Sequence, residues 1–174
     1  VETRQDHPVT HIAWYDAIAY CKWSGLRLPF EAEWEFAARG GLSRKKFPWG
    51  NQIVPNGKHM MNTWQGDFPT LNTEEDGWKG TAPVDSFPPN GFGLFNMTGN
   101  VWEWVEDFYG PRPHPKRFPE RDPKGPDEGF QRIQRGGSYL CHKSYCDRYQ
   151  VHSRIPSDPT NSAGHSGFRV ASDR

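Results

Sequence analysis

The chain has 174 residues and carries 21 Lys and Arg against 21 Asp and Glu, so its formal net charge is zero with histidine neutral. This length fits one domain, and the balanced charge gives no reason to expect a nucleic acid or an acidic membrane surface as a partner. Because no apolar run approaches the roughly 20 residues that a membrane-spanning helix needs, we expect a soluble protein without a nucleic-acid or membrane partner.

Residue usage predicts an aromatic core surrounded by long ordered loops. Aromatic residues make up 14% of the chain, and 18 glycines and 16 prolines are spread along it. Glycine and proline at this density favour turns over long helices and strands, whereas the aromatic side chains supply large apolar surfaces for a core. Three cysteines are too few for a disulfide scaffold.

Two helices are predicted near the start of the chain. Residues 10–25 carry apolar side chains at helical spacing, with Thr10 as a candidate N-cap and Gly25 as the stop. Residues 31–39 form the second helix, with acidic residues in its first turn and Gly40 directly after its end.

Beyond residue 42 the pattern predicts short strands within loops. Pro, Gly, Asn and Asp recur every few residues around single aromatic side chains. Residues 109–130, which are rich in Pro, Lys, Arg and Asp, are predicted to form a surface loop. Short strands are expected at 93–96, 100–104, 132–140 and 166–171.

Cys141 and Cys146 form the first candidate site. A separation of five places two side chains on opposite faces of an extended strand, so their sulfurs meet only if the intervening residues turn. Two buried thiols, a small-loop disulfide and a Cu(I) site with two thiolates all agree with this spacing. Structural zinc usually needs four ligands, and Cys21 is remote in the sequence. The neighbouring His142 could lower the pKa of a thiol.

Oxygen donors form the second candidate site. Asn96 and Glu103 flank a glycine-bearing turn, and Asn62 and Asp76 lie upstream. Carboxylate, amide and backbone oxygens are the ligands that Ca²⁺ takes in proteins. A tight turn followed by a strand with its tryptophans in the core also accounts for the segment 96–104. Asn96 begins a match to an N-glycosylation sequon, which is accidental if its side chain is a buried ligand.

Six motifs spread over essentially the whole chain resemble the sulfatase-modifying-factor family. They are Arg27-Leu28-Pro29 with Glu31-Ala32-Glu33-Trp34-Glu35, Phe47-Pro48-Trp49-Gly50, Asn90-Gly91-Phe92-Gly93-Leu94, Gly99-Asn100-Val101-Trp102-Glu103-Trp104, Arg135-Gly136-Gly137-Ser138 and Gly167-Phe168-Arg169. The segment Cys141-His142-Lys143-Ser144-Tyr145-Cys146 is more specific, because it resembles the active-site pair of the formylglycine-generating members. The paralogous factor that lacks catalysis lacks both cysteines.

The resemblance implies an α+β fold related to C-type lectins, with little regular secondary structure. It also implies a single domain over residues 1–174 from which the N-terminal part of the family's domain is missing. Such enzymes use O₂ to oxidise one cysteine of an unfolded sulfatase polypeptide, within a Cys-x-Pro-x-Arg segment, to Cα-formylglycine.

The resemblance also assigns roles around the two cysteines. Cys141 and Cys146 would hold Cu(I) in a near-linear bis-thiolate site, which the substrate thiol joins as a third ligand. The residues that would line the active site or lie near the substrate are Ser138, Trp102, His142, Tyr145, Arg154 and His165.

Two structural Ca²⁺ ions are implied by the same resemblance. The first would be bound by Asn62, Thr63, Asp76 and Trp78. The second would be bound by Asn96, Gly99, Val101 and Glu103. Thr63, Trp78, Gly99 and Val101 would contribute backbone carbonyls, so their side chains are free to vary.

The chain departs from the family at several positions. The two disulfides of secreted animal members fall here at Cys21, Ala38, Val151 and Val170, so neither can form. We therefore expect Cys21 to be a buried free thiol. We also expect the protein to be prokaryotic and cytoplasmic rather than secretory, since thiols stay reduced in that compartment.

Further positions also depart from the family. Phe30 replaces a helix-capping Thr, which should lower the stability of the helix by roughly 1 kcal/mol unless the Phe30 ring packs. His165 and Ser166 replace an Asn-Leu pair near the substrate groove.

Two other functions remain open from the sequence. One is a calcium-stabilised, lectin-like binding module without catalysis, which has no need for two thiols in one loop. The other is an iron-dependent oxidase of the same family, which would carry a His-x₃-His-x-Glu set. Here His7 and His11 are followed by Asp16 as the next acidic residue, so that set is not present.

Overall fold

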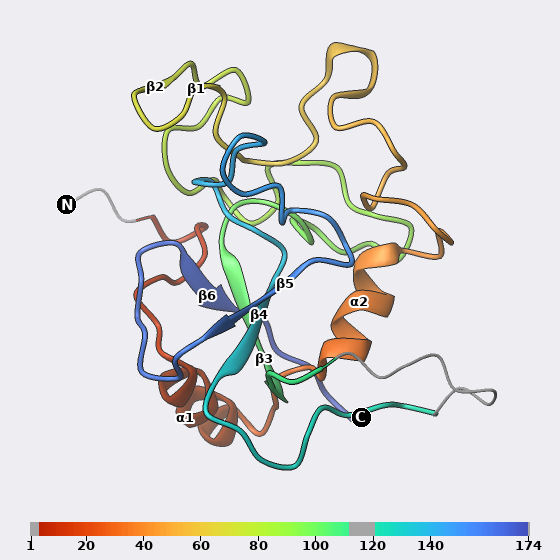
Figure 1. Cartoon of the computed structure of the whole chain (residues 1–174), viewed down its shortest axis with the longest axis vertical. Helices are drawn as coiled ribbons and strands as arrows, with labels where there is room; N and C mark the ends of the chain where they lie inside the picture. Colours follow the sequence, from red (N-terminus) through yellow and green to blue (C-terminus); the bar gives the residue numbers. More distant parts are fainter. Residues whose placement is uncertain (1–3, 112–120, 174) are drawn as a thin grey trace.

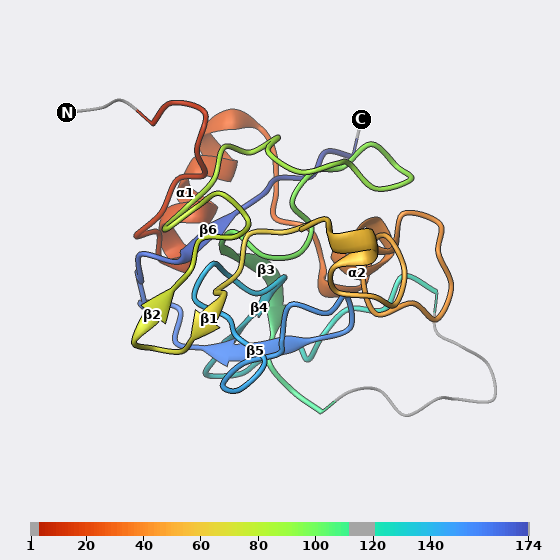
Figure 2. The ribbon, with the colours of Figure 1, turned by 90° about the horizontal axis from the view of Figure 1, so that it is seen from above.

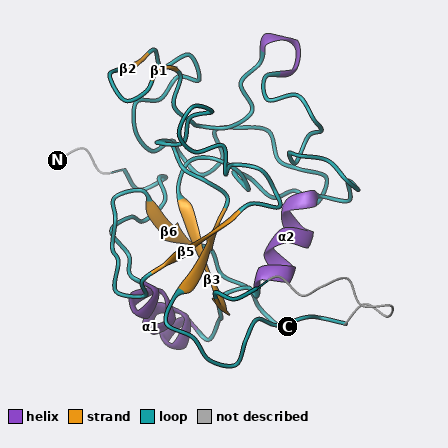
Figure 3. Ribbon diagram, in the orientation of Figure 1, coloured by secondary structure: helices purple, strands orange, loops and turns teal. Residues whose placement is uncertain are grey.

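In the computed structural model, which describes residues 4–111 and 121–173, two helices lie around a central sheet and loops make up most of the remainder (Figure 1 and Figure 3). The helices are α1 (Trp14–Ser24) and α2 (Glu31–Arg39), and the short 3₁₀ helix η1 covers Pro55–Gly57. The strands are β1 (Gly66–Asp67), β2 (Leu71–Asn72), β3 (Trp102–Phe108), β4 (Arg132–Arg135), β5 (Arg154–Ser157) and β6 (Ser166–Phe168). Within these ranges, no helix has the length and apolar character needed to cross a membrane.

The central sheet has the strand order β5-β4-β3-β6. β4 pairs antiparallel with both β3 and β5, whereas β6 pairs parallel with β3. In Figure 1, α1 lies near β6 and α2 lies on the opposite side of β4, and Figure 2 gives the same arrangement from above. β1 and β2 form a separate antiparallel hairpin in the loop-rich half of the molecule.

The helix predicted over 31–39 is confirmed, and its missing Thr cap is replaced by two carboxylates. The backbone N–H of Phe30 donates to Glu33 (2.8 Å), and that of Glu31 donates to Asp107 on β3 (2.6 Å). The Phe30 ring also packs beneath the ammonium of Lys124, 4.5 Å from the ring centroid. A remote carboxylate at a helix N-terminus satisfies an orphan N–H and favours the helix dipole.

The first helix begins later than predicted. Thr10 is not its N-cap, because Ala13, whose backbone is extended, occupies the N-cap position. The backbone N–H of Trp14 donates to the carbonyl of Pro159 (3.0 Å), so the start of the helix bonds to a distant loop. Asp16 caps the helix by accepting from the N–H of Ala13 (2.9 Å).

The strand predictions are confirmed in part. The expected strands at 100–104, 132–140 and 166–171 correspond to β3, β4 and β6, with different ends. The strand expected at 93–96 is wrong, because the Asn90 side chain accepts from the N–H groups of Phe92 and Leu94 and closes a turn.

β5 and the β1–β2 hairpin were not predicted. β5 contains Pro156, which an edge strand tolerates. Residues 112–120 of the predicted loop lie outside the described residues, and 121–130 contain no helix or strand.

Three groups of buried side chains surround the sheet. Trp34 of α2 packs with Val105 and Ile133, and Trp104 packs with the inner face of α1, including the buried free thiol of Cys21. The third group, which lies on the loop-rich side, consists of Phe47, Met61, Trp102, Cys141 and Tyr149. The aromatic core and the buried Cys21 thiol are therefore confirmed.

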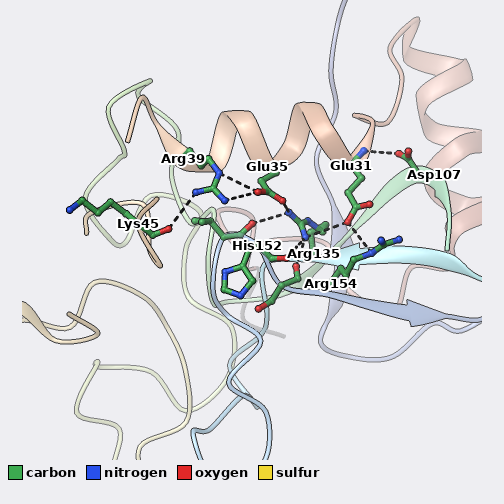
Figure 4. A network of polar contacts seen from close by, with 10 residues as sticks. Glu31, Glu35, Arg39, Lys45, Asp107, Arg135, His152 and Arg154 are labelled. Carbon is green, nitrogen blue, oxygen red and sulfur yellow. Dashed lines mark hydrogen bonds and ion pairs between the residues drawn. The ribbon is translucent and has the colours of Figure 1, made fainter. Parts of the chain in front are cut away.

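A fully buried guanidinium joins α2 to the sheet (Figure 4). Arg135, at the end of β4, donates to Glu35 of α2 (2.6 Å) and lies 3.4 Å from the carboxylate of Glu31. It also donates to the backbone carbonyls of residues 151–153 at 2.6–3.0 Å. Burial of a charge is tolerated only where it is paired and hydrogen-bonded in this way.

Replacement of Arg135 by Ala is expected to lower the free energy of unfolding by about 3–5 kcal/mol, because two carboxylates and three carbonyls lose their donor. Urea denaturation followed by tryptophan fluorescence measures this change. Arg39→Ala is the control, since Arg39 forms a part-exposed pair with the same Glu35 and should cost about 0.5 kcal/mol. Equal losses in the two variants would contradict a central role for Arg135.

Candidate functional site

Two turns bring the sulfurs of Cys141 and Cys146 together. After β4, Gly136 and Gly137 adopt positive φ angles of 93° and 78°, and a Cβ on Gly137 would lie 2.8 Å from the backbone of Tyr149. The N–H of Cys146 then donates to the carbonyl of His142 (2.7 Å) and closes a second turn. The resulting sulfur–sulfur distance is 3.0 Å, well beyond the ~2.05 Å of a disulfide bond, and both cysteines are free.

The two thiols differ in exposure. Cys141 is 2% exposed, and its carbonyl accepts from the N–H of Trp64 (3.1 Å), which ties it to the loop before β1. Cys146 is half-buried and follows three exposed residues. The pair therefore has one sulfur fixed in the core and one that faces the surface.

One hydrogen bond separates the pKa values of the two thiols. The hydrogen bond between the two sulfurs lowers the pKa of Cys146 to about 6, with help from the backbone N–H of Arg148. The same bond, together with burial, raises the pKa of Cys141 far above its usual range. Near neutral pH the pair holds a single proton, and the more accessible Cys146 carries the negative charge.

Residues predicted for the pocket surround this pair at different depths. Ser138 is buried, with its hydroxyl 4.0 Å from the sulfur of Cys141. Trp102 packs in the same buried group as Cys141. Tyr149, which no motif in the sequence distinguishes, also belongs to this group, and burial raises its pKa to about 12, so its phenol stays neutral beside the thiolate.

His142 and Tyr145 lie on the outer side of the thiol loop. The His142 ring bonds to the hydroxyl of Ser144 (2.7 Å), and Tyr145 is 74% exposed. Both rings stack on Phe68, at the tip of the β1–β2 hairpin. Nothing in the sequence distinguished Phe68 from the other aromatic residues, because His142 and Tyr145 lie more than 70 positions away along the chain.

A cavity of about 440 Å³ lies beside the thiol loop. His142 and Lys143 of that loop line it together with Tyr149, His59 and Glu75. His59 Nε2 and a carboxylate oxygen of Glu75 are 3.7 Å apart in its lining. The cavity is open and mixed in polarity, which suits a segment of polypeptide better than a small apolar molecule.

Arg154 and His165 occupy different surroundings. Arg154 of β5 forms an ion pair with Glu31 (3.1 Å) within the network of Figure 4, and its guanidinium lies over the ring of Tyr109. His165 accepts the N–H of Trp102 with its carbonyl (2.8 Å), and burial lowers the pKa of its imidazole. The structure thus places His165 next to a pocket residue and Arg154 in the buried charge network.

The first set of predicted calcium ligands gathers around the Asp76 carboxylate. Asp76 accepts from the N–H groups of Thr63 and Trp78, both at 2.9 Å, and from the amide of Gln65 (2.8 Å). The Oδ1 atom of Asn62 is buried and has no hydrogen-bond partner. An orphaned buried oxygen near a carboxylate is the arrangement expected of a cation ligand.

The second set is less open to a cation. Asn96 also has a buried Oδ1 atom without a partner. Glu103, however, accepts two hydrogen bonds from Arg169 and one from the indole of Trp34, all at 2.6 Å. Its charge is therefore already balanced. Among the described residues, no group of three or more His, Cys, Asp or Glu side chains could hold a metal ion.

Comparisons with known proteins identify the family of the chain. The model of the sulfatase-modifying factor enzyme 1-like domain matches residues 1–174. The chain is 55% identical over 98% of its length to a formylglycine-generating enzyme of Bos taurus, covering 45% of that protein. It is 53% identical over 99% of its length to one of Thermomonospora curvata, covering 58% of that protein. The chain thus spans about half the length of these curated relatives.

The fold is also found among solved structures. The structure of PvdO from Pseudomonas aeruginosa superposes with a TM-score of 0.76 and 26% sequence identity, over 95% of this chain and 61% of that one. Together with the small sheets and short helices described above, this similarity confirms the predicted α+β fold with little regular structure.

The shared proton predicts an unusual pH profile for alkylation. Because the thiolate is the reactive form, the rate at which iodoacetamide modifies Cys146 should rise with pH and reach half its maximum near pH 6. In Cys141→Ala the midpoint should move toward the ordinary thiol value of about 8.5. Mass spectrometry of the peptide containing residue 146 measures the rate. An unchanged midpoint in Cys141→Ala would contradict the hydrogen bond as its cause.

Proposed function

The chain belongs to the sulfatase-modifying factor enzyme 1-like family, and on that premise we propose that it converts a cysteine of a sulfatase polypeptide to Cα-formylglycine with O₂. The single observation that carries this proposal is the convergence of the Cys141 and Cys146 sulfurs to 3.0 Å beside an open cavity. The relatives named as formylglycine-generating enzymes support the same reaction.

When O₂ is reduced fully to water, the electron balance of this reaction requires a second reductant. Conversion of a CH₂–SH group with water to an aldehyde and H₂S releases two electrons and two protons. Reduction of O₂ to two molecules of water accepts four of each. The remaining two electrons and protons come from two further thiols, which form a disulfide. A thiol reductant therefore belongs in any assay of this activity.

We propose Cu(I) as the cofactor, held by Cys141 and Cys146. The donor set fits, because two thiolates without harder ligands favour a soft monovalent ion. The two sulfurs lie 3.0 Å apart and would have to separate to admit an ion between them. The half-buried Cys146 is the side chain free to move outward. Bound Cu(I) would supply the centre at which O₂ oxidises the substrate thiol.

The protein side chains would position the substrate and exclude water. The cavity beside the thiol loop accepts an extended Cys-x-Pro-x-Arg segment, whose thiol approaches the more exposed sulfur of Cys146. Trp102, Ser138 and Tyr149 close the inner side of the pair. His142 lines the cavity and Tyr145 is exposed on the same loop, so both rings would offer aromatic contacts to the peptide.

We further propose a structural role for Ca²⁺. The site of Asn62, Thr63, Asp76 and Trp78 fits best, since the orphaned Asn62 oxygen lies in the same loop region as the Asp76 carboxylate. In the site of Asn96, Gly99, Val101 and Glu103, the Arg169 guanidinium already balances the carboxylate, so this site is the weaker of the two.

A compartment that keeps thiols reduced suits this function. Cys21, Cys141 and Cys146 are all free, and disulfides are rare in the bacterial cytoplasm. A prokaryotic cytoplasmic location is therefore our proposal.

Incubation of the reduced, Cu(I)-loaded protein in air with a Cys-x-Pro-x-Arg peptide and dithiothreitol should replace the peptide thiol with an aldehyde, which mass spectrometry detects. Cys146→Ser should abolish turnover without unfolding the protein, because one of the two soft donors is lost. Cys21→Ser is the matched control and should keep turnover, since Cys21 is a buried residue of α1 in a different group from the thiol pair. Retained turnover in Cys146→Ser would overturn the proposed thiolate mechanism.

Calcium is expected to raise the melting temperature of EDTA-treated protein, because a ligand that binds only the folded state stabilises it by about 2.7 kcal/mol at 100 times its Kd. Asn62→Ala should remove most of this rise, and Asn96→Ala should reduce it less. Differential scanning calorimetry with and without CaCl₂ measures the effect, with MgCl₂ as the control. A calcium effect that is unchanged in Asn62→Ala would exclude the first site.

A further inference from the structure

The β1–β2 hairpin carries an aromatic ring onto the thiol loop. Phe68, at the tip of this hairpin, stacks on Tyr145 with ring centroids 4.9 Å apart and planes inclined by 12°. It stacks on His142 at 6.3 Å and 11°. Trp64 meets Phe68 edge-on at 5.3 Å and supports it from within the same segment. One ring thus touches both the first and the last side chains of the turn that separates the cysteines.

The same segment also holds the backbone of the buried cysteine. The N–H of Trp64 donates to the carbonyl of Cys141 (3.1 Å), four residues before Phe68. Residues 64–68, which we call the clamp segment, therefore contact the loop at both of its ends. The contact with Cys141 is a backbone hydrogen bond, whereas the contact with the turn before Cys146 is aromatic stacking.

The position of Cys146 depends more on this contact than the position of Cys141 does. Cys141 is 2% exposed and packs against Trp102 and Tyr149 in the core. Cys146 is half-buried, and residues 143–145 before it are exposed. Two hydrogen bonds to the His142 carbonyl define this turn, at 2.9 Å from Tyr145 and 2.7 Å from Cys146. Cys146 packs against the buried group that contains Cys141. Stacking of Phe68 on His142 and Tyr145 attaches the exposed part of the turn to the β1–β2 hairpin.

We propose that Phe68 is a positioning residue, which fixes the turn between His142 and Tyr145 and thereby holds the sulfur of Cys146 next to that of Cys141. Its consequence for catalysis rests on the proposed function, but its effect on the two thiols does not. Stacked aromatic pairs contribute beyond the area they bury, so the shape of the Phe68 ring matters as well as its volume.

The equilibrium between the dithiol and its disulfide tests this proposal. In a buffer of reduced and oxidised dithiothreitol, the two thiols give two electrons and two protons to the cyclic disulfide of the reagent and form one S–S bond. The equilibrium constant reports how closely the protein holds the two sulfurs. Alkylation followed by mass spectrometry measures it, in a Cys21→Ser background that leaves only the pair.

Phe68→Ala is expected to lower this equilibrium constant about tenfold, because both stacking contacts are lost. Phe68→Tyr keeps the ring and should lie within about twofold of the parent. Phe68→Leu keeps apolar volume without a ring, and should resemble Ala. Phe92→Ala is the matched control and should leave the equilibrium constant unchanged. Phe92 is half-exposed, and its ring contacts Phe36 of α2, with centroids 5.4 Å apart, rather than the thiol loop.

An equilibrium constant unchanged in folded Phe68→Ala overturns the proposal, and one restored fully by Leu overturns the role of the aromatic ring. If Phe68→Ala does not fold, the difference between Leu and Tyr at this position tests the same contact. The measurement needs neither copper nor peptide. A wild-type protein that neither takes up Cu(I) nor converts the peptide would refute the proposed function and leave the result for Phe68 standing.

Discussion

The buried guanidinium of Arg135 is the interaction on which the rest of this structure depends. It binds α2 through two carboxylates and the chain at residues 151–153 through three carbonyls. Arg135 itself and residues 151–153 bracket the thiol loop, which leaves β4 at Gly136 and returns to the core at Val151. Few long strands are present to hold the ends of this loop by backbone hydrogen bonds. The buried Arg135 guanidinium, which must be paired and hydrogen-bonded, holds them instead.

Between those fixed ends, the two cysteines are held in unequal environments. Cys141 lies in an aromatic group and keeps its proton, whereas Cys146 is half-buried and acidic. As ligands of a metal ion, the buried Cys141 would be the rigid one and the more accessible Cys146 the adjustable one. This inequality matters for the proposed cofactor, because Cys141 and Cys146 would hold the metal ion as thiolates, so the shared proton would have to leave.

Strand β3 connects the candidate sites through its alternation of side chains. Trp102 faces the thiols, Glu103 pairs with Arg169 beside Asn96, and Trp104 packs against α1. The period of two in a strand places Glu103 on the face opposite to Trp102 and Trp104. The two tryptophans pack in different buried groups, one with Cys141 and one with α1. A change of register here would disturb all three at once.

The sequence by itself determined what local chemistry controls: α2 with its acidic first turn and glycine stop, an aromatic core, and cysteines whose spacing demanded a turn. Helix period, turn residues and donor type are properties of neighbouring residues, so they can be deduced without coordinates. The tertiary structure alone decided the start of α1, the edge strand β5, the shared proton and the stacking of Phe68 on the thiol loop. Each of these depends on groups that lie far apart in the chain, such as the Pro159 carbonyl that bonds to Trp14. Burial sets their strength, because hydrogen bonds and charges that water would screen become decisive once the surrounding loops exclude it.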